Sequence, residues 1–282
     1  MKKLVTVAIP TYNREKYLKQ SINSVLNQTF KNFELLVVDN HSEDNTQKVV
    51  EDIHDGRIRY IRNKKNIGIL NNWNKCIDLA KGKYLVILGD DDILLPTFVE
   101  ESLKVHGKYN LGFSFTHCNK VDKNGKFLMR WGYEFPPPGF LKGDKYLELT
   151  VKYGACLTNS TTVMLNKSIF KKIGKFETKY STNTFDFNMW IKIADKFNLY
   201  FIDKVLAHYR IHEDQVSEIH WRRKKIHTGK MGTYLEIFDA IASLMQRNSY
   251  YANKAKRRFI LSKLKEYDME LTKLLTEAVP EL

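Results

Sequence analysis

The sequence has little cysteine and no long apolar run. Only 3 of its 282 residues are cysteine, and Cys76, Cys118 and Cys156 are scattered without the spacing of a metal site. We therefore expect core thiols in a reducing compartment. No segment approaches the roughly 20 consecutive apolar residues of a membrane-spanning helix. The apolar run at residues 4–9 is short and ends at Pro10, which indicates a strand rather than a signal peptide, so we expect a cytoplasmic protein.

Acidic residues are scarce as well, most of all near the C-terminus. The chain has 46 Lys and Arg against 32 Asp and Glu, which gives a formal net charge of +14. Between Trp221 and Lys265 the only acids are Glu236 and Asp239. Such a surface attracts polyanions, whether nucleic acid or the anionic leaflet of a membrane, and composition favours neither.

The first hundred residues alternate between strand and helix patterns. The expected strands are short apolar runs at residues 4–9, 34–38 and 84–88, and an alternating segment at residues 57–62. Between them, residues 14–28 and 68–81 carry apolar side chains at helical spacing, and residues 42–46 open a further helix. This alternation predicts an α/β fold with a doubly wound parallel sheet.

The second half is less regular. A helix is expected from Pro96 to Val105, then a hairpin that turns at residues 123–125, and later elements at residues 142–153, 161–165, 168–173 and from 186. A strand from Leu199 ends near His212, and from about residue 215 only helical patterns remain. We therefore divide the chain into a main domain, 1–214, with halves 1–105 and 106–214, and a basic helical extension, 215–282.

Asp90, Asp91 and Asp92 follow the wholly apolar strand at residues 84–88. Three adjacent carboxylates repel one another at neutral pH, and a divalent cation shared with a substrate phosphate makes such a cluster tolerable. The alternative is a solvated acidic turn in which Asp92 caps the helix that begins near Pro96.

Polar residues stand at the ends of all four expected strands. They are Pro10, Thr11, Tyr12 and Asn13, then Asp39, then residues 63–68, and then the three aspartates. In a parallel sheet these ends converge on one edge, where ligands bind. An acid that closes the second strand can accept hydrogen bonds from a ribose or base, and aspartates with a metal can hold a diphosphate. The alternative for each site is an ordinary polar loop.

Several motifs in this order resemble family 2 glycosyltransferases of the GT-A fold. The resemblance covers about residues 4–212 and rests on the following motifs: Val-Ala-Ile-Pro-Thr-Tyr-Asn at 7–13, Val-Val-Asp-Asn at 37–40, Asn-Ile-Gly at 66–68, and Ala-Lys-Gly-Lys-Tyr at 80–84 with the aspartates after it. It implies a mixed, mainly parallel sheet flanked by helices. It also implies an inverting enzyme that uses a nucleoside-diphosphate sugar, most often with uridine, and Mn²⁺ or Mg²⁺.

The resemblance also implies roles for single residues. The nucleotide would be bound by Pro10, Thr11, Tyr12, Asp39, Asn66, Gly68 and Asp90. Asp91 would be the direct metal ligand, with Asp92 and His212 as further metal residues, and Arg210 would contact the diphosphate. The family commonly has Asp-x-Asp-Asp before the helix proline, and Gly89 occupies the first of those positions here.

Asp186 is the implied catalytic base. Family members have an acidic pair before a helix of the Leu-Trp-Leu-Arg-Leu type, and Phe185 replaces the first acid here. The alternative is that Asp186 is only the N-cap of that helix. In either role the helix N-terminus favours the ionised form, so we expect a low pKa. For His212 the alternative is a polar surface residue at a strand end.

The C-terminal helices carry apolar stripes at residues 234–245 and 260–274. They either pack against each other or the main domain, or their basic faces hold the protein at an anionic membrane where a lipid-linked acceptor lies. A homo-oligomer is left open.

The leading hypothesis is a hexosyl- or N-acetylhexosaminyltransferase for a cell-surface polysaccharide, which moves a sugar from a UDP-sugar to a hydroxyl of a glycan or lipid-linked acceptor. A nucleotidyltransferase is the alternative, although the sequence has no Gly-rich, basic phosphate loop after the first strand. A non-catalytic nucleic-acid binder would leave the aspartates unexplained, because carboxylates repel phosphates unless a metal intervenes. We expect no nucleic-acid partner.

Overall fold

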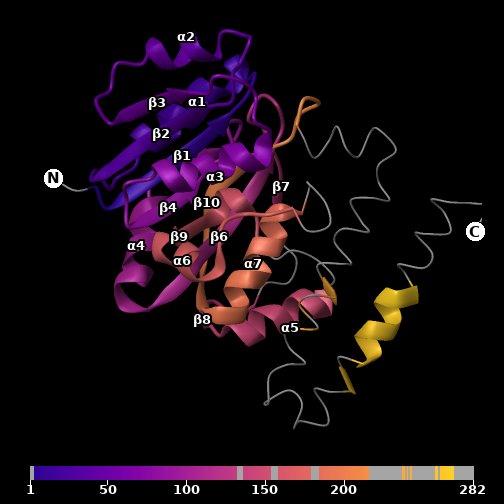
Figure 1. The fold of residues 1–282 in the computed structure, drawn as a ribbon. Coiled ribbons are helices and arrows are strands. Elements are labelled where there is room, and N and C mark those ends of the chain that lie inside the picture. Colours follow the sequence, from indigo (N-terminus) through magenta and orange to yellow (C-terminus); the bar gives the residue numbers. More distant parts are fainter. Residues whose placement is uncertain are drawn as a thin grey trace, which may run out of the picture. The chain divides into compact units, whose positions relative to one another are not determined.

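The computed structural model describes residues 3–131, 136–153, 158–178, 184–215, 237–238, 240, 242, 258–259 and 261–269, and Figure 1 labels their elements. The chain forms two compact units. The first unit comprises Met1–Phe140, Thr158–Phe176 and Asn198–Ile211. The second unit comprises Leu141–Leu157, Glu177–Phe197 and His212–Leu282.

The first unit is built on a 10-stranded sheet with the order β3-β2-β1-β4-β9-β6-β10-β5 along its main path. Its N-terminal half contains β1 (Val5–Thr11), β2 (Phe33–Asp39), β3 (Ile58–Arg62) and β4 (Tyr84–Ile87), all parallel. Every residue of β1, β2 and β4 is buried, which explains their continuous apolar runs. The predicted doubly wound sheet is confirmed.

The other half of the sheet mixes strand directions. Two long strands, β6 (Leu111–Val121) and β10 (Asn198–Arg210), run parallel, while β9 (Val163–Asn166) is antiparallel to both β4 and β6. The short strand β5 (Ile93–Leu94) adds to β10, a pairing that its two residues did not reveal in the sequence. The sheet is therefore mixed and mainly parallel, as the resemblance implied.

Helices flank this sheet (Figure 1). In the first unit they are α1 (Glu15–Leu26), α2 (Thr46–Glu51), α3 (Ile69–Leu79), α4 (Phe98–Lys108) and α6 (Phe170–Ile173), with 3₁₀ turns at Ser160–Thr162 and Lys167–Ile169. Helix α1 is an example of how such a helix packs: its inward residues Leu18, Ile22 and Val25 are fully buried in the same core as the residues of β1 and β2. The helix expected from Pro96 begins at Phe98, and the strand expected at 161–165 begins as a 3₁₀ turn.

The position of β1 within the strand order creates a point where the winding of the sheet reverses. The chain passes from β1 outward to β2 and β3, then returns to β4 on the other side of β1. The loops after β1 and β4 therefore leave the sheet in adjacent positions where the winding direction reverses. In open α/β sheets this switch point is where ligands bind.

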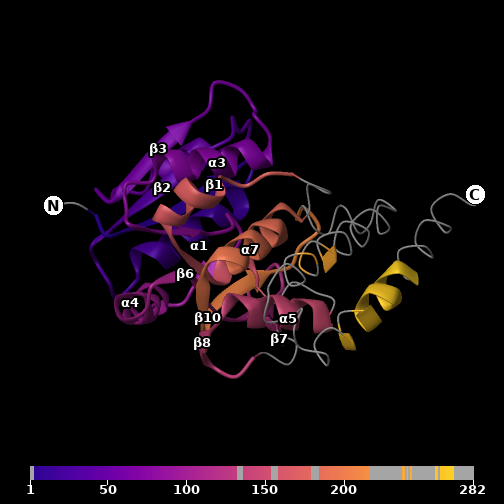
Figure 2. The same ribbon diagram turned by 60° about the horizontal axis from the view of Figure 1, so that its bottom comes forward.

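The second unit contains α5 (Gly143–Tyr153) and α7 (Phe185–Lys196), which lie side by side (Figure 2). Their approach is close at Gly143, where a Cβ atom would lie 1.9 Å from the Ala194 carbonyl oxygen. The Tyr267 hydroxyl donates to the Val151 carbonyl at 2.6 Å, which ties a C-terminal helical segment to α5. Most of the predicted 215–282 extension lies outside the described residues.

Two further strands, β7 (Phe127–Trp131) and β8 (Gly139–Leu141), lie off the main path of the sheet. The predicted hairpin is confirmed, since β7 pairs antiparallel with β6. In the part of the chain that the structure describes, no helix combines the length and the apolar character needed to cross a bilayer.

Candidate active site

The loop after β1 is fastened to the loop after β2. Asn13 has a φ of 52°, and its side-chain oxygen accepts a hydrogen bond from the Glu43 amide at 2.8 Å. In return, the Asn13 amide donates to the Ser42 hydroxyl at 2.9 Å, and the Arg14 amide donates to the Thr46 hydroxyl at 2.9 Å. Asn tolerates this left-handed conformation better than most residues, so the tight turn fits the sequence.

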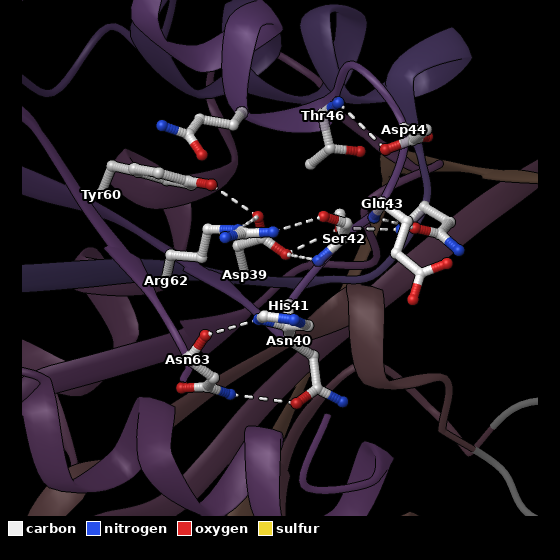
Figure 3. A network of polar contacts seen from close by, with 12 residues as sticks. Asp39, Asn40, His41, Ser42, Glu43, Asp44, Thr46, Tyr60, Arg62 and Asn63 are labelled. Atoms are coloured by element: carbon white, nitrogen blue, oxygen red, sulfur yellow. Dashed lines mark hydrogen bonds and ion pairs between the residues drawn. The ribbon is translucent and has the colours of Figure 1, made fainter. Parts of the chain in front are cut away.

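Asp39 lies at the centre of a polar network at the end of β2 (Figure 3). One carboxylate oxygen accepts hydrogen bonds from the Ser42 amide at 2.8 Å and the Ser42 hydroxyl at 2.7 Å. The other accepts from the Tyr60 hydroxyl at 2.5 Å and faces the Arg62 Nε at 3.6 Å. Asp39 itself is 0% exposed, so it orients Tyr60 and Arg62 while its predicted contact with the nucleoside stays a prediction.

Burial and the Asp39 carboxylate raise the pKa of Tyr60 well above its usual value. The Tyr60 hydroxyl therefore keeps its proton and acts as a fixed donor to Asp39.

A chain of asparagines holds the loop between β3 and α3. The Asn63 side-chain amide donates to both Asn40 and Asn72 at 3.0 Å, and Asn40 donates to Asn66 at 2.7 Å. Asn66 also accepts from the Gly68 amide at 2.9 Å, and Gly68 has a φ of 82°, which only glycine adopts easily. The predicted pocket residues Asn66 and Gly68 thus lie in one ordered loop at the sheet edge.

Asp90 and Asp91 form a like-charge pair at the switch point. The Tyr12 amide donates to the Asp90 carboxylate at 3.3 Å, so the loops after β1 and β4 meet as the topology requires. The Arg14 Nε lies 3.3 Å from an Asp90 oxygen and 4.0 Å from an Asp91 oxygen, and supplies positive charge between them.

The electrostatics confirm that this pair is under strain. Burial and, second, the charge of Asp91 together raise the pKa of Asp90 to about 7, against the opposing effects of Arg14 and the Tyr12 amide. The predicted mutual repulsion of the aspartates is therefore present in the folded protein. A metal cation bound between these two carboxylates and a substrate diphosphate would reduce this repulsion, in addition to the charge of Arg14.

Asp92 points into the protein. It is 2% exposed, one of its oxygens accepts from the Arg210 amide at 2.9 Å, and the other accepts from the Thr161 hydroxyl. The alternative in which Asp92 caps the next helix is wrong, because Thr97 occupies the N-cap position of α4. Its carboxylate is a fixed support for the aspartate turn, and its predicted metal role stays a prediction.

Gly89 gives this turn its space. A Cβ atom at Gly89 would lie 2.8 Å from Asp92 Oδ2 and 3.0 Å from Asp91 Oδ1. The carboxylates of residues 91 and 92 therefore occupy the volume that a side chain at residue 89 would need, which gives a physical reason for the glycine at this position.

Arg210 is also directed inward and is 0% exposed. Its Nε donates to the Asp91 carbonyl at 2.8 Å, and its terminal nitrogens donate to the Lys123 carbonyl at 3.0 Å and the Gln20 side chain at 2.7 Å. The guanidinium therefore braces the aspartate turn in this structure. A contact with a diphosphate, as predicted from the resemblance, would require it to leave these partners.

In the second unit, Asp186 is the second residue of α7, not its N-cap, which is Thr184. The N-cap alternative is therefore wrong. The expectation of a low pKa is wrong too: burial raises the pKa of Asp186 to about 6, although the Phe187 amide donates to it at 2.8 Å. Removal from water outweighs the favourable helix N-terminus.

His212 belongs to the second unit as well and is 4% exposed, so it is not the polar surface residue of the alternative. Its carbonyl accepts a hydrogen bond from the Gln215 amide at 3.2 Å. Its predicted role as a metal ligand stays a prediction.

The fit of a divalent cation depends on Asp90 and Asp91. Across the described ranges, no three His, Cys, Asp or Glu side chains are already arranged around a common metal position. The pair does offer carboxylate oxygens alone, the donors that Mg²⁺ and Mn²⁺ prefer, and Mg²⁺ is commonly bound by one or two carboxylates with substrate phosphates. The donor set therefore fits such a cation if the remaining ligands come from a diphosphate and water.

Some site residues were missed by sequence reasoning. Arg14 and Thr161 contact the aspartates, yet Arg14 reads as the start of an ordinary helix and Thr161 as the start of an ordinary strand. Asn63, by contrast, belongs to the predicted site at residues 63–68.

The fold and this edge define a doubly wound α/β protein with paired carboxylates at its switch point. Comparison with known families extends this class to a particular family. Residues 6–174 match the model of "Glycosyl transferase family 2", which is more than half of the chain. The chain belongs to this family.

Individual relatives agree. An uncharacterized glycosyltransferase of Methanocaldococcus jannaschii is 32% identical over 79% of this chain and 81% of its own length. An Escherichia coli protein, the UDP-Glc:alpha-D-GlcNAc-diphosphoundecaprenol beta-1,3-glucosyltransferase WfgD, is 26% identical over 83% of this chain and 87% of its own. The crystal structure of S. aureus TarS 1–349 in complex with UDP-GlcNAc has a TM-score of 0.65 and 18% identity, over 86% of this chain and 71% of that one. The last likeness establishes the GT-A type fold.

Proposed function

We propose that the chain transfers a sugar from a UDP-sugar to a hydroxyl of a glycan or lipid-linked acceptor in cell-surface polysaccharide synthesis, at the cytoplasmic face of the membrane. The observation that carries the proposal is the Asp90–Asp91 pair beside Tyr12 at the switch point of the sheet. The donor and acceptor classes are supported by the E. coli relative, whose name contains UDP-Glc and an undecaprenol-linked acceptor, and by the UDP-GlcNAc bound to TarS.

The donor half of the proposal rests on residues 1–105. Pro10, Thr11 and Tyr12 end β1 next to Asp90, and the Thr11 carbonyl accepts from the Asn40 amide at 2.8 Å, beside Asp39. We assign the nucleoside to this edge, with Asp39 acting through the Tyr60 and Arg62 side chains that it orients. Residues 106–214 carry Asp186 and are assigned to the acceptor.

A bound Mn²⁺ or Mg²⁺ supplies positive charge to the leaving diphosphate, which lowers the barrier to its departure. Asp90 and Asp91 would hold it, and His212 is proposed as a further ligand because a neutral imidazole suits Mn²⁺. We assign Asp92 and Arg210 as positioning residues, since their polar atoms are already bound within the protein.

The reaction that we propose is a single displacement. Asp186 accepts the proton of the acceptor hydroxyl while the hydroxyl oxygen forms a bond to the anomeric carbon. The bond from that carbon to the diphosphate oxygen breaks, its electron pair stays on the diphosphate, and the configuration inverts. A base of this kind contributes about 10²–10⁴-fold to the rate.

Two substitutions separate the assigned roles. Asp91→Ala should abolish metal-dependent UDP binding, whereas Asp186→Asn should retain that binding and lower transfer by about 10²-fold or more. Calorimetry with UDP and Mn²⁺ measures the first effect, and a screen of UDP-sugar hydrolysis and transfer measures the second. Asp78→Ala and Asp195→Asn are matched controls, the latter on the same helix as Asp186. Normal turnover by Asp186→Asn would remove the base assignment.

A further inference from the structure

The β6–β7 hairpin, residues 120–131, carries an unusual surface that the proposed function does not use. Three consecutive large apolar side chains on β7 are exposed to solvent: Phe127 is 57% exposed, Leu128 51% and Met129 54%. Soluble proteins rarely expose contiguous apolar side chains unless they mark an interaction site. All residues from 123 to 130 are exposed.

The hairpin exposes these side chains because of its place in the sheet. Lys120 pairs with Met129 and Val121 with Phe127, with an irregularity in register between them, so Leu128 is an extra residue on β7. On β6, Cys118 and Val121 are buried, and on β7 Trp131 packs against the core. Phe127, Leu128 and Met129 of β7 stay exposed.

The charge of the hairpin is mainly positive. Basic residues surround the apolar group at Lys120, Lys123, Lys126 and Arg130. Of the nearby acids, Asp122 is turned into the hairpin, where it accepts hydrogen bonds from the Asn124 and Lys126 amides at 2.9 Å. Asp203 faces Arg130 at 3.4 Å and His117 at 2.9 Å. The exposed tip at residues 123–130 contains no acid.

We propose that this hairpin docks the protein on an anionic membrane, with Phe127, Leu128 and Met129 in the interface and Lys123 and Lys126 against the headgroups. Apolar side chains ringed by basic residues are the composition that binds anionic bilayer surfaces. The edge of β7 has backbone amides and carbonyls that hydrocarbon cannot satisfy, so insertion stops at headgroup depth.

Charge argues against a second copy of the chain as the occupant. If two β7 edges paired antiparallel about Leu128, Lys126 of each copy would face Arg130 of the other, and like charges directly opposite destabilise a strand pair. A polar anionic glycan would match the lysines and leave the apolar side chains in water. An anionic lipid surface matches both.

The hairpin is joined rigidly to the donor site. The same Arg210 guanidinium donates to the Lys123 carbonyl in the hairpin turn and to the Asp91 carbonyl in the aspartate turn. The Ile211 amide also donates to the Val121 carbonyl at 2.8 Å. Docking through residues 123–129 would therefore hold the donor site at the membrane surface, independently of the basic residues beyond 215.

Sedimentation of the full chain with phosphatidylcholine vesicles, with and without phosphatidylglycerol, tests the proposal. We expect binding only to the anionic vesicles. The triple variant Phe127→Ser/Leu128→Ser/Met129→Ser should weaken it about tenfold or more, and Lys123→Gln/Lys126→Gln should weaken it by a similar factor, since each basic residue near the surface contributes about fivefold. Both variants should retain UDP binding, which shows that they fold.

Matched control variants change residues elsewhere in the sequence. Met269→Ser removes an even more exposed apolar side chain, and Lys171→Gln/Lys172→Gln removes two exposed lysines. Neither should weaken vesicle binding. An environment-sensitive fluorophore at Leu128→Cys should brighten on anionic vesicles, whereas one at Met269→Cys should not.

Several outcomes would overturn the proposal. Absence of vesicle binding by the full chain is one, and hairpin variants that bind as tightly as the unaltered chain are another, since the basic C-terminal residues would then be responsible. Loss of a dimer in the triple variant on light scattering, without a change in vesicle binding, would assign the hairpin to a second copy. These results would leave the transferase proposal intact, because donor binding is measured separately.

Discussion

At the scale of single residues, the donor site depends on where side-chain atoms are missing as much as on where they are present. Gly89 shows this, because its absent Cβ leaves room for the carboxylates of Asp91 and Asp92. By resemblance to the family, an acid is missing at this position. In the structure, the glycine leaves the space that the two carboxylates occupy.

Gly89→Ala should therefore weaken metal-dependent UDP binding, because the new methyl group displaces Asp92 Oδ2, which the Thr161 hydroxyl holds in place. We expect about tenfold weaker binding, and a loss of about 1–3 kcal/mol in unfolding free energy from overpacking. Calorimetry and urea denaturation measure the two effects. Gly107→Ala is the control, since nothing lies within 4 Å of its added Cβ, and that change in α4 should stabilise. Unaltered UDP binding in Gly89→Ala would contradict this account of the turn.

Asp186 leads to a prediction of pH dependence. Because burial raises the pKa of Asp186 to about 6, the carboxyl is protonated below that pH and cannot accept the acceptor proton. The turnover number at saturating donor and metal should therefore fall about tenfold per pH unit below roughly pH 6, and level off above roughly pH 7.

Saturating donor is essential in that experiment, because Asp90, whose pKa lies at about 7, affects donor binding over a neighbouring range. The comparison is with Asp186→Asn, whose residual rate should lack the rise near pH 6. A rise centred near pH 4 in the unaltered enzyme would mean that the helix N-terminus prevails over burial.

At the scale of elements, the loops of the sheet edge are held together by contacts between residues far apart in the sequence. Arg210, at the end of β10, joins the aspartate turn after β4, the turn between β6 and β7, and Gln20 of α1. The Arg210 guanidinium carbon also lies over the Tyr17 ring, 5.1 Å from the ring centroid. One buried side chain thus fixes the relative position of several elements of the first unit.

Arg210→Lys should accordingly lower the unfolding free energy by about 2–4 kcal/mol, because an ammonium keeps the charge but cannot reach carbonyls in several directions. Urea denaturation measures this. Arg57→Lys is the surface control, where a partly exposed pair with Asp55 should cost less than about 1 kcal/mol. If Arg210→Lys kept full stability and lost only UDP binding, we would conclude that Arg210 contacts the diphosphate directly and does not stabilise the fold.

At the scale of the whole molecule, the charge of the aspartate pair is partly offset within the fold. Arg14 lies against Asp90 and near Asp91, so we expect the first unit to fold without a metal. The formal charge of +14 acts in addition as a long-range attraction for anionic donors and surfaces.

Chelation should therefore abolish UDP binding and sugar transfer without lowering the melting temperature. Mn²⁺ together with UDP should raise the unfolding free energy by about 2.7 kcal/mol at a UDP concentration 100 times its Kd. Differential scanning calorimetry of the full chain, with EDTA, with Mn²⁺, and with Mn²⁺ and UDP, measures these effects. A melting temperature that fell in EDTA alone would indicate a structural metal instead.

The sequence determined the sheet and the location of the site. Residues 4–9, 34–38 and 84–88 are apolar throughout because both faces of β1, β2 and β4 are buried, and this pattern is local and readable. The polar residues that follow each strand therefore had to gather at one edge, and the motifs there sufficed to predict the family.

Only the tertiary structure decided what those polar side chains face. Arg210 and Asp92 are separated by 118 residues yet share a buried hydrogen bond, and Asp186 has a raised pKa because the fold removes water from it. The same holds for β7, whose apolar residues read as an ordinary strand but stand in solvent. Periodicity along a chain reports which residues can be buried together, whereas desolvation and hydrogen bonding depend on neighbours that only folding brings near.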